Sequence, residues 1–176
     1  NYIKNLKLLT KNHVYSKEME HDACGVGLIA STEGKKSRAV VEYGIEALKA
    51  VWHRGAVDAD GKTGDGAGIH VEIPKDFFIE KIEVTGHDYD NSEICVGMIF
   101  LPRNDYSSQE NCKTIVESEL TKNNFSIYGW RQVPVNPKVL GEKALQTMPE
   151  IIQVLFKSND PNLLDKNLER NIYEIR

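Results

Sequence analysis

The sequence predicts a mixed domain of the α/β or α+β class with layered packing. Short apolar runs typical of strands alternate loosely with segments of helical periodicity, and neither kind dominates. The chain has 176 residues, of which 40% are hydrophobic. A chain of this size buries roughly 70% of the surface that it exposes when unfolded. We therefore expect one domain, or part of one, with a single core.

The first third of the chain contains an extension, a strand and a helix. Residues 1–23 are polar and lack sustained periodicity, so we expect them to precede the ordered core. CGVGLIA, residues 24–30, is short, apolar and bounded by Gly and Ser, which favours a buried strand. A helix that ends near Gly55 should follow the turn at STEGKKS. Its apolar positions recur at spacings of four, three and four, at Val41, Ile45, Leu48 and Trp52.

Residues 55–68, GAVDADGKTGDGAG, are too rich in glycine for the interior of a helix or strand and predict a long structured loop or disorder. The remaining expected elements are a strand at 68–74, a short helix opened by Pro74, a strand at 93–102, a helix at 107–123, a strand at 125–135, a short helix near 141–146, a strand at 151–156, and a last helix whose N-cap and first turn are Asp160 and Pro161.

Composition limits the function classes. The 22 basic and 26 acidic side chains give a net charge of −4 and are interspersed, which argues against nucleic acid as a partner. No apolar run approaches the roughly 20 residues of a membrane helix, and the N-terminus lacks the apolar stretch of a signal peptide. The three cysteines are odd in number and lack metal-site spacing, which argues against a disulfide framework or a zinc site. We expect a reduced, cytoplasmic protein with no membrane partner.

Both ends of the sequence suggest a piece of a longer chain. Asn1 is not an initiator Met, and residues 162–176 stop inside an amphipathic pattern without a helix stop signal.

Cys24 is a candidate nucleophile because Gly25 allows backbone and ligand to approach the sulfur closely. By itself this position fits a small buried hydrophobe better, since cysteine is among the most buried residue types. Two features change the balance. Cleavage of the Ala23–Cys24 bond would make the cysteine N-terminal, and an HRGA segment with a glycine-rich loop begins about thirty residues later.

Three segments, CGVGLIA, AVWHRGAVDADGKTGDGAGIHVEIP and YGWRQVPVNPKVLGEKALQTMPEIIQV, resemble the glutaminase domain of the glutamate synthase large subunit. The resemblance runs from about His21 to the end and implies an α+β N-terminal-nucleophile hydrolase, in which two antiparallel sheets lie between helix layers. It also implies that residues 1–23 are a leader or propeptide and that 24–176 are the N-terminal part of a type 2 glutamine amidotransferase domain.

The same resemblance implies the chemistry. Cys24 would attack glutamine and form a glutamyl thioester, while Gly25, Arg54 and Gly55 would support the nucleophile and the substrate site. Without the family, Arg54 fits a cation at a helix C-terminus better, and His53 fits a packing role. The family's oxyanion-hole Asn-Gly pair and its Arg and Asp that hold the substrate lie beyond Arg176, so we expect the 176 residues alone to be inactive.

No cofactor is expected within this chain. The resemblance implies FMN and an iron–sulfur cluster elsewhere in the full-length enzyme, and as partners glutamine, the rest of the large subunit and a small reductase subunit. Two alternatives stay open: the glutaminase of another class II amidotransferase, and a non-catalytic binding domain of the same fold.

The other conspicuous residues have structural interpretations. TGDGAG lacks the ending of a phosphate-binding loop and is expected to shape a wall of the site. The default roles are loop anchoring for Asp58 and Asp65, core packing and a surface ion pair for Trp130 and Arg131, and inert core thiols for Cys95 and Cys112.

Overall fold

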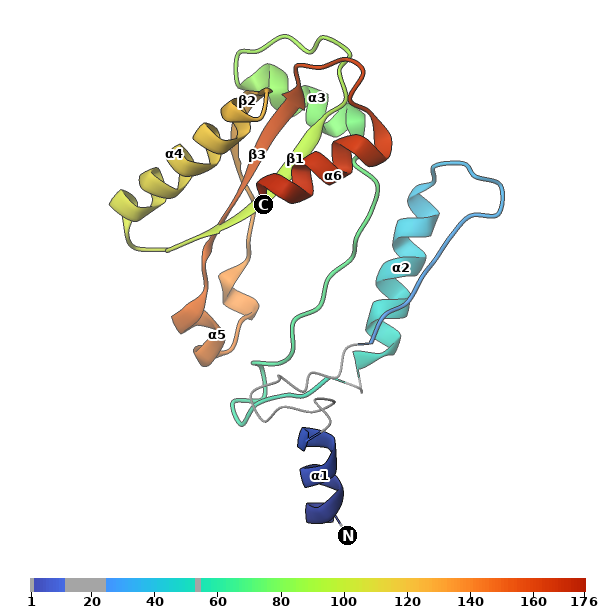
Figure 1. Cartoon of the computed structure of the whole chain (residues 1–176). Coiled ribbons are helices and arrows are strands. Elements are labelled where there is room, and N and C mark those ends of the chain that lie inside the picture. The colour runs from blue at the N-terminus through green and yellow to red at the C-terminus, as the bar shows by residue number, and fades with distance from the viewer. Residues whose placement is uncertain (1, 12–24, 53–54) are drawn as a thin grey trace. The chain divides into compact units, whose positions relative to one another are not determined.

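The computed structural model describes residues 2–11, 25–52 and 55–176 (Figure 1). The chain divides into two units, Asn1–Gly55 and Ala56–Arg176.

The described residues of the first unit include two α-helices, α1 (Tyr2–Lys11) and α2 (Arg38–Ala50). The Ser37 side chain caps α2 by accepting a hydrogen bond from the backbone N of Ala39 at 3.2 Å. The side of α2 that carries Val41, Ile45 and Leu48 is half-buried, as its periodicity predicts.

Three expectations for the first unit are wrong. Helix α1 forms where no element was expected; its Leu and Lys residues have good helix propensity. Helix α2 ends at Ala50 and not near Gly55, because its C-cap Val51 leaves helical geometry at φ −95° and ψ 10°. Residues 25–30 form no strand. Val26 and Leu28 are 96% and 89% exposed, since a strand requires a hydrogen-bonded neighbour and an apolar pattern alone does not provide one.

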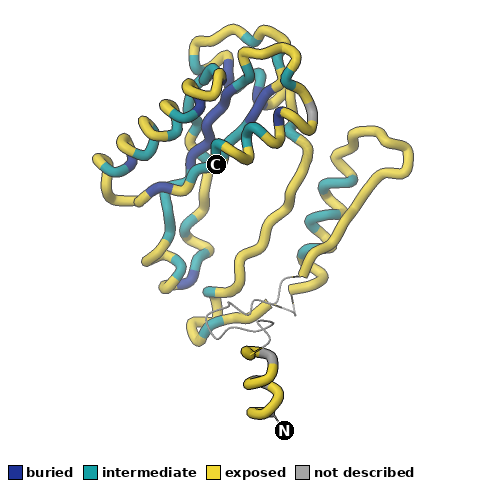
Figure 2. The backbone as a smooth tube through the Cα atoms, in the orientation of Figure 1, coloured by how far each residue is buried: buried dark blue, intermediate teal, exposed yellow. Residues whose placement is uncertain are grey.

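The second unit is built on an antiparallel three-stranded sheet of order β1-β3-β2. Its strands are β1 (Cys95–Leu101), β2 (Phe125–Gln132) and β3 (Glu150–Ser158). β3 is the central strand and pairs with both of the others; its IIQVLF run presents apolar side chains to both faces, and residues 152–156 are all buried. Figure 2 shows the buried positions concentrated on this sheet and the helices beside it, whereas residues 25–39 are exposed throughout.

Helices α4 (Tyr106–Lys122) and α6 (Asp165–Ile175) cover one face of the sheet. Asp105 caps α4 by accepting a hydrogen bond from the Ser108 backbone N at 3.0 Å. The cluster on this face consists of Cys95, Leu120, Phe125, Val154, Phe156 and Leu168.

Helix α3 (Lys75–Val84) lies on the opposite face, directly after Pro74. Its buried Phe78 and Ile82 pack with Leu155, whose side chain points away from the α4 face because successive strand residues alternate. The other end of this face is more open, since Met98 and Phe100 of β1 are 49% and 63% exposed.

The remaining elements are the 3-10 helix η2 (Pro137–Val139) and α5 (Glu142–Thr147), which confirms the short helix predicted near 141–146. The strands expected at 93–102, 125–135 and 151–156 and the helices expected after Pro74 and at 107–123 are also confirmed. The described part of the chain is therefore α+β.

Two expectations for the second unit are wrong. Residues 68–74 contain no strand, and Ile69 and Val71 are each 45% exposed. Helix α6 starts at Asp165 after the N-cap Leu164, because the Asp160 side chain accepts from the Asn162 backbone N at 2.9 Å and closes a separate turn.

Candidate active-site segments

Two of the four predicted site residues, Cys24 and Arg54, lie outside the described residues, as does His53. Gly25 is exposed and has open space around its Cα atom. Gly55 is exposed and donates its backbone N–H to the carbonyl of Trp52 at 3.0 Å. The functional roles of all four stay predictions.

The glycine-rich loop that follows Gly55 has a short paired stem. The backbone N of Ala56 donates to Oδ2 of Asp65 at 2.9 Å, and the backbone N of Asp65 donates to the Ala56 carbonyl at 3.2 Å. One residue further in, Val57 and Gly64 form an isolated antiparallel bridge. These bonds fix the backbone where the chain leaves Gly55, so residues 56–65 form a structured loop.

Asp60 organises the tip of this loop. Its carboxylate accepts from the Thr63 hydroxyl at 2.5 Å and from the backbone N–H groups of Lys62 and Thr63 at 2.9 and 2.7 Å. Gly61 has φ +66°, a conformation that glycine adopts without strain. The Thr63 hydroxyl and then these backbone donors lower the pKa of Asp60 to about 2. The carboxylate is therefore ionised at neutral pH.

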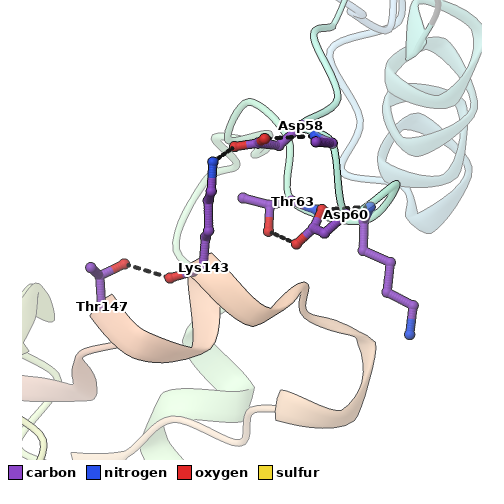
Figure 3. Close-up of polar contacts among 7 residues, drawn as sticks. Asp58, Asp60, Thr63, Lys143 and Thr147 are labelled. Atoms are coloured by element: carbon purple, nitrogen blue, oxygen red, sulfur yellow. Dashed lines mark hydrogen bonds and ion pairs between the residues drawn. The ribbon is translucent and has the colours of Figure 1, made fainter.

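The loop is anchored to α5 through charges. Nζ of Lys143 lies 2.6 Å from Oδ2 of Asp58 (Figure 3). The backbone N–H of Glu142, the first residue of α5, adds a smaller hydrogen-bond contribution to the lowered pKa of Asp60. The loop-anchoring roles predicted for Asp58 and Asp65 are thus confirmed.

Sequence reasoning missed Asp60 and Lys143. The sequence did contain a signal for Asp60. It is followed by Gly61 and, three positions on, by Thr63, and an Asp in such a pattern often accepts hydrogen bonds from its own turn. No local signal existed for Lys143, since 85 residues separate it from Asp58.

The other predicted residues lie on the sheet and its helices. Trp130 packs against the α4 face and donates from Nε1 to Oε1 of Glu117 at 2.6 Å. Arg131 was expected to form a surface ion pair, but among the described residues its guanidinium makes different contacts. It donates from Nη1 to Oε1 of Gln153 at 2.6 Å, and its guanidinium lies 5.1 Å from the centre of the Phe77 ring.

The two described cysteines differ in burial. Cys95 is 5% exposed in the core, and desolvation, followed by nearby carboxylates, raises the pKa of its thiol to about 12. Cys95 is therefore an inert core thiol at neutral pH. Cys112 is half-buried on α4.

The described residues offer no grouping suited to a metal centre: no three His, Cys, Asp or Glu side chains among them could together hold an ion. An iron–sulfur cluster is held by several cysteine thiolates, so the described residues do not fit one. Within the same part of the chain, no helix has the length and hydropathy to cross a membrane.

The model of the class-II glutamine amidotransferases matches residues 24–176. The chain belongs to this family. Its match starts at the cysteine predicted as the nucleophile and includes the anchored loop.

Several individual relatives of the chain are glutamate synthases. The chain is 54% identical over 172 residues to the glutamate synthase [NADPH] large chain of Azospirillum brasilense, covering 98% of this chain and 11% of that protein. It is 40% identical over 158 residues to a ferredoxin-dependent glutamate synthase of Arabidopsis thaliana, covering 89% of this chain and 10% of the relative. The chain thus spans about a tenth of the length of these relatives.

Proposed function

We propose that the chain supplies the glutaminase of a glutamate synthase, which hydrolyses glutamine to glutamate and ammonia at Cys24. The observation that carries the proposal is the family match over residues 24–176, together with 54% identity to a glutamate synthase large chain. A different class II amidotransferase is disfavoured because relatives at 54%, 40% and 37% identity are all named glutamate synthases.

Removal of residues 1–23 would turn Cys24 into an N-terminal residue. A free α-amino group has a pKa of about 8, so near neutral pH it can take the thiol proton directly or through water, which an amide nitrogen cannot do. The family match that begins at residue 24 supports the assignment of 1–23 as a leader and 24–176 as amidotransferase domain.

The thiolate of Cys24 would attack the side-chain amide carbon of glutamine and form a tetrahedral oxyanion. Collapse of this intermediate breaks the carbon–nitrogen bond, and the proton held by the α-amine leaves with the nitrogen as ammonia. Water then attacks the glutamyl thioester, releasing glutamate and restoring the thiol. Gly25 leaves room for the substrate beside the sulfur, and Arg54 with Gly55 supports the surrounding backbone.

For the fold we propose the sandwich of two antiparallel sheets between helix layers. The open end of the α3 face supports it, because Met98 and Phe100 point from that face and remain 49% and 63% exposed. Ile69 and Val71 alternate with polar residues, which is the pattern of a strand, and both are exposed. This combination fits a strand whose neighbouring strand is not among the described elements.

In the complete enzyme the ammonia would aminate 2-oxoglutarate at a separate site, with FMN and an iron–sulfur cluster held outside residues 1–176. The rest of the large subunit and a small reductase subunit would be the partners. Because the substrate-holding and oxyanion motifs of the family are expected beyond Arg176, the 176 residues alone should hydrolyse no glutamine.

The test is Cys24→Ala in the complete, mature enzyme. Glutamine-dependent glutamate synthesis should be abolished and ammonia-dependent synthesis retained, because only the release of ammonia needs the thiol. Retained glutamine hydrolysis would contradict the proposal. Absence of hydrolysis in the unsubstituted enzyme would favour a non-catalytic binding domain of the same fold.

A further inference from the structure

The loop from Ala56 to Gly66 has two kinds of support, one within the loop and one from α5. Its own stem and tip are closed by Asp65 and Asp60, as described above. Its attachment to α5 includes the ion pair of Lys143, whose side chain is 66% exposed and contributes no apolar packing to either core cluster. This ion pair can therefore be removed while the sheet core stays intact.

The contact between loop and α5 is close. A Cβ atom added to Gly141, the N-cap of α5, would collide with the hydroxyl of Thr63 and the carboxylate of Asp60 and would lie 2.5 Å from the Thr63 backbone N. Only glycine at this position lets the loop tip sit against the start of the helix. The close approach at Gly141 and the ion pair of Lys143, two residues further along the chain, thus act on the same loop.

The loop's stem begins one covalent bond after Gly55, a predicted site residue. Both backbone polar groups of Ala56 are bonded to Asp65, so a shift of the loop also turns the peptide that joins Gly55 to Ala56. Displacements of about 1 Å can lower an enzymatic rate by about 100-fold, because catalysis depends on the alignment of the reacting groups.

The geometry points to Lys143, with Asp58 and Asp60, as positioning residues for the glutaminase reaction: they hold the glycine-rich loop on α5 and so fix the backbone that leaves Gly55. This inference rests on the proposed function. None of the three residues acts on glutamine directly. Lys143 neutralises Asp58, and Asp60 closes the loop tip that meets α5.

The experiment uses the complete, mature enzyme and measures glutamine-dependent and ammonia-dependent synthesis separately. Lys143→Met removes the charge and keeps the length of the side chain, and it should lower the glutamine-dependent kcat/KM at least tenfold. Ammonia-dependent turnover should stay within twofold. Lys143→Arg keeps a cation that can bond Asp58 and should retain most of the activity. Gly141→Ala, which displaces the loop without changing any charge, should reproduce the loss.

Lys122→Met is the matched control, because Lys122 forms an ion pair of the same 2.6 Å length with Glu119 on α4, away from the loop. It should leave both activities unchanged. The unfolding midpoint of each variant is measured alongside; a general structural effect would lower it and would reduce both activities together.

Two outcomes separate this inference from the proposed function. If the unsubstituted enzyme releases no ammonia from glutamine, the proposed function fails. If it does so, and Lys143→Met and Gly141→Ala keep its glutamine-dependent kcat/KM within twofold, the positioning role alone is overturned. Equal losses in Lys143→Met and Lys143→Arg would also overturn it, since the ion pair would then be irrelevant.

Discussion

Lys157 on β3 and Asp90 in the segment between α3 and β1 form an ion pair across 67 residues of sequence. The hydroxyl of buried Tyr128 donates to Oδ1 of Asp90 at 2.9 Å, and Nζ of Lys157 lies 5.6 Å from the centre of the Tyr128 ring. Lys157, followed by Ser92, holds the pKa of Asp90 well below its usual range. Burial, followed by the hydrogen bond to Asp90, raises the pKa of Tyr128 well above its usual range. These contacts tie the segment to the sheet.

The lowered pKa of Asp90 predicts that the free energy of unfolding decreases as the pH falls. A carboxyl group whose pKa is lower in the folded state stabilises the fold fully above its unfolded pKa, about 3.9, and this contribution is lost as pH falls through that value toward the folded pKa. Urea unfolding between pH 7 and pH 3, followed by tryptophan fluorescence, should show Asp90→Asn converging with the wild-type chain at low pH. At pH 7 the variant should be less stable by about 1 kcal/mol or less, because Asp90 is partly exposed. An equal difference at both pH values would contradict the assignment.

Leu155 is predicted to contribute strongly to the stability of the fold, because it is fully buried on the α3 side of the central strand. Leu155→Ala should lower the free energy of unfolding by about 2–5 kcal/mol, through lost burial and the cavity left behind. Ile115→Ala on α4 is the control. Its side chain is 56% exposed, so the change should stay within about 0.5 kcal/mol. Similar losses in both variants would argue against the assigned core.

Arg54 has two interpretations with different outcomes. A cation near a helix C-terminus contributes about 0.3–1 kcal/mol through the helix dipole, so Arg54→Ala would then lower the unfolding midpoint slightly and leave turnover unchanged. If Arg54 instead orders the backbone around the nucleophile, the same change should cut glutamine-dependent turnover about tenfold or more in the complete enzyme. Arg54→Lys keeps the charge but not the planar fork, so it should rescue only the dipole role. Ammonia-dependent synthesis is the internal control.

The leader is predicted to silence the nucleophile until it is removed. A precursor in which cleavage at Ala23–Cys24 is blocked should hydrolyse no glutamine, because the amine that serves as base is still an amide. A diazo-ketone glutamine analogue should then label Cys24 in the mature enzyme and not in the precursor, as read by intact mass. Equal labelling of the two forms would falsify the need for cleavage.

Local pattern predicted most elements of the second unit. Helices α3, α4 and α5 and all three strands were found from apolar periodicity and from residues that start or stop elements, because these signals act between neighbours in the sequence. The three segments that resemble the glutaminase domain also identified the family. The loop roles of Asp58 and Asp65 followed from the glycines around them.

Only the tertiary structure decided which of these elements find partners. Residues 25–30 and 68–74 have strand-like patterns, yet neither forms a strand, because a strand depends on hydrogen bonds to a neighbour that its own sequence cannot specify. The central place of β3 follows from pairing on both edges, and the partnership of Lys143 with Asp58 spans 85 residues. Such contacts depend on the path of the whole backbone, so they cannot be predicted from the residues that neighbour each partner in the sequence.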